Sequence, residues 1–145
     1  MRAITFSPDR GGVFDVLSGL VKKGLGGTRG PGTQYASWIH ERDLARAVEL
    51  SISEERWTGV VNLASPNPLP NREFMRALRE AWGIHIGLPA PSWLLEVGTF
   101  FMRTETELVL KSRRVIPGKL LDAGFQFEFQ EWKGAVRDWR VGTRR

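Results

Sequence analysis

The chain contains no cysteine, which excludes disulfides, thiolate metal sites and cysteine nucleophiles. It has only two histidines, His40 and His85, so a zinc site built from several imidazoles is excluded as well. No apolar run approaches the roughly 20 residues that are needed to span a bilayer. The amino terminus lacks the architecture of a signal peptide. We therefore expect a soluble cytoplasmic protein with no membrane contact.

The 145 residues suit a single domain, and 41% hydrophobic with 26% charged residues is ordinary for a globular protein. The formal net charge is +5, which is typical of proteins with anionic partners. The basic residues are scattered, however, and most have an acidic neighbour: one predicted helix carries Arg72, Arg76 and Arg79 beside Glu73 and Glu80. Only the tail, at residues 140–145, is basic without acidic residues. A solvated surface is therefore favoured over a nucleic-acid interface.

Helical spacing of apolar residues predicts helices at 13–23, 40–53, 71–82, 91–101, 105–110, 118–123 and 131–139. Short apolar runs predict strands at 2–6, 59–64, 85–88 and 125–129, the last with its three phenylalanines on one face. We expect Gly24 to end the first helix and Asn71 to cap the third. The buried stripe of the second helix is predicted to hold Leu44, Ala47, Val48 and Ile52. Strands that alternate with helices indicate an α/β or α+β fold.

The predicted strands are few and well separated, and none forms an obvious hairpin with its neighbour. An isolated pair of strands is marginal in water, and parallel strands need a larger sheet to be buried in. The chain therefore looks like part of a larger fold.

The glycine-rich loop at 24–32 is the first candidate for phosphate binding. It follows a predicted helix instead of a strand, and it lacks the Gly-Lys-Ser/Thr ending of a P-loop. Nor does it open a helix whose amino terminus could hold a pyrophosphate. A sharply turning loop is therefore favoured over a nucleotide cradle.

His40 and Asp43 lie three residues apart at a helix start and could share a face. Stabilisation by the helix dipole accounts for Asp43 at this position without a catalytic role. A core or capping role is favoured for His40 over a role as a general base. Tyr35 is followed four positions later by Ile39, so the Tyr-x-x-x-Lys arrangement of hydride chemistry is absent. Trp38, beside the glycine loop, could line a ligand, although core packing is the simpler explanation. No catalytic, cofactor-binding or metal-binding residue is assigned.

Several stretches together resemble a known family. They are Gly-Leu-Gly-Gly at 24–27, Gly-Thr-Gln-Tyr-Ala-Ser-Trp-Ile-His-Glu-Arg-Asp-Leu at 32–44, Val-Asn-Leu-Ala-Ser-Pro-Asn-Pro at 61–68, and Arg-Val-Ile-Pro-Gly-Lys-Leu-Leu at 114–121. In this order they are similar to the C-terminal half of NAD(P)-dependent epimerase/dehydratase-like proteins, which are extended short-chain dehydrogenases/reductases. The resemblance is to an uncharacterised epimerase branch sometimes described as cell-division-inhibitor-like.

The resemblance implies the C-terminal part of a Rossmann-like fold, with few strands and packed helices. Residues 1–64 resemble the end of the Rossmann-like sheet, and residues 65–145 resemble the small C-terminal domain. A complete family member has a preceding half that carries a glycine-rich dinucleotide motif and the tyrosine–lysine pair. NAD(P) is thus implied for the complete protein, and we expect this chain alone to bind no cofactor and to transfer no hydride.

By position in the family, Gln34, Trp38 and His40 would face or support a substrate cleft, and Arg2 would lie where a strand enters near it. Nucleotide-sugar epimerases usually carry an arginine four residues before the histidine of this motif, where it contacts the diphosphate. That position is Ala36 here. A nucleotide-diphosphate-sugar substrate is therefore not carried over to this chain.

Three hypotheses follow. In the first, the chain is the substrate-binding half of an epimerase-like protein, truncated or split, and acts only with a cofactor half supplied by another chain. In the second, it is a non-catalytic interaction module that forms a homodimer or binds a protein partner through its apolar faces. In the third, it is a basic nucleic-acid-binding domain, which would bind more weakly as salt rises. The first is favoured, and its small-molecule substrate is left open.

Overall fold

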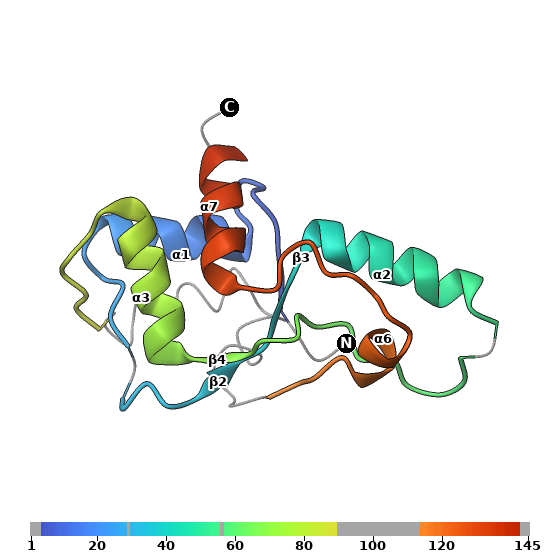
Figure 1. Cartoon of the computed structure of the whole chain (residues 1–145). Helices are drawn as coiled ribbons and strands as arrows, with labels where there is room; N and C mark the ends of the chain where they lie inside the picture. The colour runs from blue at the N-terminus through green and yellow to red at the C-terminus, as the bar shows by residue number, and fades with distance from the viewer. Residues whose placement is uncertain (1–3, 29, 56, 90–113, 143–145) are drawn as a thin grey trace.

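The computed structural model describes residues 4–28, 30–55, 57–89 and 114–142, arranged as Figure 1 shows. The elements are β1 (Ile4–Phe6), α1 (Val13–Lys22), β2 (Tyr35–Ala36), β3 (Trp38–His40), α2 (Glu41–Ser53), β4 (Leu69–Pro70), α3 (Asn71–Trp82), α6 (Gly118–Asp122) and α7 (Trp132–Gly142). The helices expected at 91–101 and 105–110 fall outside the described residues. The expected α/β class, with short sheets and packed helices, is confirmed.

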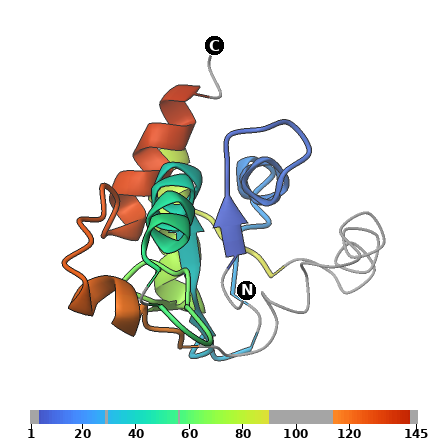
Figure 2. The ribbon, with the colours of Figure 1, turned by 90° about the vertical axis from the view of Figure 1, so that its right-hand side faces the viewer.

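Two short sheets join segments that are distant in the sequence. Strand β1 pairs with β3 in parallel, with Thr5 opposite Ile39, and α1 lies in the connection between them. Strand β2 pairs with β4 in antiparallel fashion, with Ala36 opposite Leu69. In Figure 2, β1 is seen between α1 and α7. Because β2 and β3 are separated only by Ser37, this stretch of chain links both sheets.

The predicted helices at 13–23, 40–53, 71–82, 118–123 and 131–139 are confirmed as α1, α2, α3, α6 and α7. Gly24, at φ +78°, follows the C-cap of α1, and Gly83, at φ +68°, ends α3 in the left-handed region. The expected cap of α3 was placed one residue late. Pro70 occupies the N-cap position, and the Asn71 amide donates to the Gln34 carbonyl at 2.7 Å.

Two predicted strands are wrong because no partner strand accompanies them. Residues 59–64 carry no strand: Val60 is 80% exposed, and the backbone joins β3 only beyond the segment, where the Ser65 amide donates to the Trp38 carbonyl. Residues 85–88 are also irregular, although the Leu88 amide donates to the Gly24 carbonyl. Single hydrogen bonds connect these segments to the rest of the chain, but they do not form the regular series of hydrogen bonds that defines a sheet.

The strand predicted at 125–129 is wrong for a different reason. The Glu128 and Phe129 amides donate to the carboxylate of Asp43 instead of to another strand. The three phenylalanines also do not share one cluster. Phe125 and Phe127 meet at 4.8 Å beside α6, whereas Phe129 packs on the main core.

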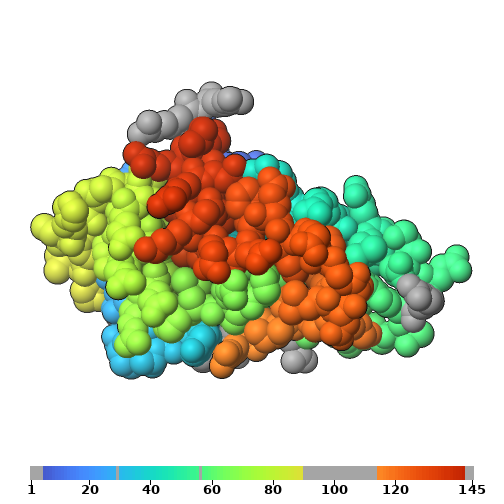
Figure 3. Space-filling view, in the orientation of Figure 1, coloured from blue at the N-terminus to red at the C-terminus, as the bar shows by residue number. Residues whose placement is uncertain are grey.

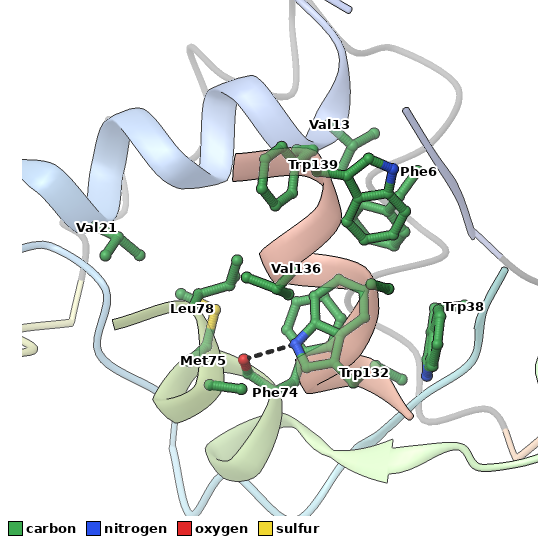
Figure 4. Packing of buried hydrophobic residues seen from close by; sticks show 14 residues of the cluster. Phe6, Val13, Val21, Trp38, Phe74, Met75, Leu78, Trp132, Val136 and Trp139 are labelled. Atoms are coloured by element: carbon green, nitrogen blue, oxygen red, sulfur yellow. Dashed lines mark hydrogen bonds between the residues drawn. The ribbon is translucent and has the colours of Figure 1, made fainter. Parts of the chain in front are cut away.

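The main core lies where α1, α3 and α7 meet β1 and β3, and it is rich in aromatic rings. Trp132 is its centre: its ring stacks on Phe74 at 4.0 Å and meets Phe6 and Trp38 edge-on at 5.0 and 5.1 Å. Its indole nitrogen donates to the Phe74 carbonyl at 3.1 Å (Figure 4). Aromatic rings in such contacts add to the stability that burial alone provides.

A smaller cluster of Ala47, Leu120 and Phe127 joins α2 to α6. The stripe predicted for α2 is only half right. Ala47 is buried, but Val48 and Ile52 are 39% and 78% exposed. Figure 3 shows the segment from residue 114 to the end of α7 running across the front of the molecule. Within the described ranges, no helix has the length and apolarity that crossing a membrane requires.

Candidate functional site

The junction between β3 and α2 gathers the polar groups of the core around His40. This residue ends β3, is fully buried, and serves as the N-cap of α2, where its Nδ1 accepts the Arg42 amide proton at 3.2 Å. The ring lies between Phe129, stacked at 3.9 Å, and Trp139, stacked at 4.6 Å. Because Nδ1 acts as an acceptor, the proton of the neutral ring resides on Nε2.

The Nε2 nitrogen of His40 faces the Asp138 carboxylate of α7 at 3.3 Å. Arg42 holds the same carboxylate at 2.5 Å and reaches Glu128 at 2.6 Å with its other terminal nitrogen. The guanidinium also lies over the Phe129 ring at 4.7 Å. Helix α7, the start of α2 and the segment before α7 are thus joined by one charged network.

The protonation states follow from burial and neighbours. Burial lowers the pKa of His40, and this effect exceeds the opposing influence of Glu41, so the ring is neutral at pH 7. Burial raises the pKa of the Asp138 carboxyl, but the hydrogen bond from Arg42 and the positive charge of Arg42 lower it more. Its pKa therefore lies below the ordinary value, and Asp138 is ionised. His40 is thus neutral and buried, and its two ring nitrogens link the end of β3 to α2 and to α7.

Asp43 is the polar residue whose importance the sequence reasoning missed. Its carboxylate is fully buried and accepts the Glu128 and Phe129 amide protons at 2.8 and 2.9 Å. Arg46, one turn later, donates to it at 3.1 Å. The available signal was its spacing of four from Ala47, which places Asp43 on the buried face of the helix.

Two of the predicted cleft residues lie together in the core. Trp38 and His40 are fully buried residues of β3, and Trp38 donates its indole proton to the Asn67 carbonyl at 3.2 Å. Gln34 stands apart, half-buried before β2, where its carbonyl accepts the Asn71 amide. Arg2 falls outside the described residues. Their role at a substrate cleft stays a prediction.

The glycine-rich loop is a turn, as predicted: Gly24, Gly30 and Gly32 all have positive φ. Gly27 crosses the chain at Leu88 so closely that an added Cβ would lie 2.5 Å from the Leu88 carbonyl carbon. Across the described ranges, no group of three or more histidine, aspartate or glutamate residues has the placement to hold a metal ion.

Comparisons with known proteins identify the relatives of this chain. Residues 90–139 match the family described as Domain of unknown function (DUF1731). The epimerase family protein Mb2239 of Mycobacterium bovis is 37% identical over 124 residues, which is 86% of this chain and 40% of that protein. The bovine epimerase family protein SDR39U1 is 34% identical over 116 residues, 79% of this chain and 39% of that protein.

Among solved structures, the human epimerase family protein SDR39U1, crystallised with NADPH, superimposes with a TM-score of 0.79 at 28% identity. The match covers 96% of this chain and 46% of the human one. The chain thus spans about two fifths of the length of its curated relatives, and it matches the C-terminal part of the epimerase fold.

Proposed function

We propose, since this chain is related to the C-terminal part of the epimerase family proteins, that it supplies the substrate side of an NAD(P)-dependent epimerase-like protein. The cofactor would be held by a half that is not among these 145 residues, whether in another chain or in a longer one. On this proposal the 145 residues alone bind no cofactor and catalyse no reaction.

The observation that carries the proposal is the parallel pair of β1 and β3. Each strand has three residues, and in the part of the chain that the structure describes these two form a sheet of their own. Parallel sheets are normally larger and covered on both faces, because a short parallel pair has too few hydrogen bonds to be stable in water. Further strands beside this pair would complete such a sheet.

Uncovered apolar side chains support the same proposal. On α2, Ile52 is 78% exposed, and in the following loop Val60 is 80% exposed. Ile116 and Leu121, before and within α6, are 42% and 43% exposed. Single exposed apolar residues are ordinary, but on α2 the exposed Val48 and Ile52 continue a stripe that begins in the core.

For substrate binding we propose that Trp38 and His40 act as positioning residues. Both are buried, so they would hold β3 and the neighbouring loop in place instead of touching a ligand. Gln34, half-buried at the start of the same stretch, would contact the substrate. Ala36 in place of an arginine argues against a nucleotide-diphosphate sugar as the substrate.

Amide hydrogen exchange tests the pairing directly. The 145-residue chain is measured alone and with the part of human SDR39U1 that precedes its matching region. We expect the β1 amides of Ile4–Phe6 to exchange quickly in the isolated chain and to slow on mixing. A monodisperse monomer whose β1 amides are fully protected without any partner would contradict the proposal.

The exposed apolar residues of α2 also suit the second hypothesis, a non-catalytic module that forms a homodimer. Light scattering separates the two: a stable homodimer that leaves the added half unbound favours the interaction module. A nucleic-acid-binding role has less support, because the basic residues do not form a continuous stripe.

A further inference from the structure

We propose that a groove between α3 and the glycine-rich loop binds the phosphoryl group of a small phosphorylated ligand. The groove has a volume of about 490 Å³, and its walls include Arg72, Arg76 and Arg79 together with Gly27, Thr28 and Gly87. The inference concerns this chain alone and does not depend on pairing with a cofactor-binding half.

The three arginines are spaced to act together. Positions 72, 76 and 79 follow the i, i+4, i+7 pattern, so their side chains leave α3 on the same side. The one carboxylate among the residues that line this groove is Glu73. Three positive charges therefore face a single negative one, and the groove attracts anions.

The described residues neutralise only part of the positive charge of these three arginines. Across the described ranges, the Arg72 side chain has no hydrogen bond or ion pair. Arg76 lies 3.6 Å from one oxygen of Glu80, and Lys133 lies 3.1 Å from the other, so Arg76 shares this carboxylate with a second cation. The hydrogen bond from Lys133 lowers the pKa of Glu80, as expected of a carboxylate already paired. An anion in the groove would give Arg72 a partner that the described residues do not supply, and would be a second partner for Arg76.

Arg79 and the loop form a fixed wall. The Arg79 guanidinium donates to the Gly26 carbonyl at 2.6 Å and lies against Gly87, where an added Cβ would stand 2.8 Å from its nitrogen. The Gly27 amide donates to the Leu88 carbonyl at 3.0 Å, which ties the loop to the segment after α3. These contacts bring the glycine loop and α3 side by side (Figure 1). A site held in place before the ligand arrives loses less entropy on binding.

A phosphoryl group suits this chemistry because its several oxygens can bind more than one arginine at once. The planar fork of arginine forms paired hydrogen bonds with phosphate, and several arginines can share one phosphoryl group. The three arginines line one bounded groove, which favours a small ligand over a nucleic acid.

Calorimetric titration of the 145-residue chain with inorganic pyrophosphate at low ionic strength tests the site. We expect saturable binding of one pyrophosphate, with Arg72→Gln weakening the affinity about tenfold or more. The matched control is Arg137→Gln, which removes the same charge from an exposed position on α7 and should change the affinity less than about twofold. Arg72→Lys keeps the charge but loses the fork and should fall between the two.

Three results would overturn the proposal. One is the absence of saturable binding, with Arg72→Gln and the unaltered chain melting at the same temperature. Another is an equal loss of affinity in Arg72→Gln and Arg137→Gln, which would show attraction by net charge alone. The third is a single-stranded oligonucleotide that binds more tightly than pyrophosphate at equal salt.

Discussion

The Asp43 carboxylate accepts two backbone amide protons that a neighbouring strand would otherwise accept. Substituting asparagine for Asp43 should measure how much these hydrogen bonds contribute to the free energy of unfolding. In the folded chain it accepts two backbone amide protons, from Glu128 and Phe129, and a third hydrogen bond from Arg46. An asparagine of the same shape has one acceptor oxygen. Its amide group would face one of the two N–H donors and leave that donor unpaired.

The magnitude follows from the burial of the site. Asp43 has 0% exposure, and a buried donor without a partner costs about 1–3 kcal/mol. Asp43→Asn should therefore lower the free energy of unfolding by about 2 kcal/mol or more. Asp43→Ala, which leaves both amides unpaired, should lower it by about 3–5 kcal/mol, a large part of the stability of an ordinary domain.

Urea unfolding followed by tryptophan fluorescence gives the comparison, because Trp38, Trp132 and Trp139 lie in the core. Glu49→Gln is the matched control, since it removes one negative charge from an exposed position of the same helix. It should change the free energy of unfolding by less than about 0.5 kcal/mol. A loss in Asp43→Asn no greater than in this control would refute the role assigned to the carboxylate.

Three further predictions concern other parts of the fold. Burial lowers the pKa of His40, so the unfolded state binds more protons than the folded state when the pH is below about 6.5. The free energy of unfolding should therefore fall as the pH drops below about 6.5, by at most about 1.4 kcal/mol per pH unit. Unfolding curves between pH 7 and pH 5 should show this fall. His40→Asn, which can still cap α2, should make the free energy of unfolding depend less on pH. The same pH dependence in His40→Asn and in the unaltered chain would contradict a neutral His40. Gly27→Ala should destabilise the chain by about 2 kcal/mol or more, because the added Cβ would clash with the Leu88 backbone. Gly134→Ala, in α7 with open space around it, should stabilise the chain by about 0.5–1 kcal/mol. Thermal melting of both variants tests this contrast, and equal changes in melting temperature would contradict it. Ile52→Lys should leave the free energy of unfolding within about 0.5 kcal/mol of the unaltered chain, because Ile52 is exposed. The same substitution should weaken binding of a cofactor-binding half to α2. A pull-down in which the variant and the unaltered chain bind that half equally would contradict this.

The helices were predictable from the sequence because their signals are local. Gly24 and Gly83 mark the ends of α1 and α3. The apolar spacing of residues 13–23 and 71–82 is set by the period of one helix, whatever packs against it. Core packing was the simpler interpretation of Trp38, and its side chain is fully buried, whereas its role at a substrate cleft stays a prediction.

The errors arose where the outcome depends on distant partners. Residues 59–64 and 125–129 have the composition of strands, but a strand exists only beside another one. For 125–129 the decisive partner is Asp43, which lies some 85 residues earlier and satisfies the amides that a neighbouring strand would take. The arginine groove was missed similarly, because Gly27 and Gly87 meet only in the folded chain.

The claim that the cofactor half lies outside these 145 residues is tested most directly by an NADPH titration, followed by fluorescence of the bound nicotinamide. The chain is titrated alone and then with the part of human SDR39U1 that precedes the matching region. With excess inorganic pyrophosphate present to occupy the arginine groove, we expect no saturable NADPH binding to the chain alone, and tighter NADPH binding by the mixture than by the added half alone. Saturable binding of NADPH to the isolated 145 residues under these conditions would contradict the claim.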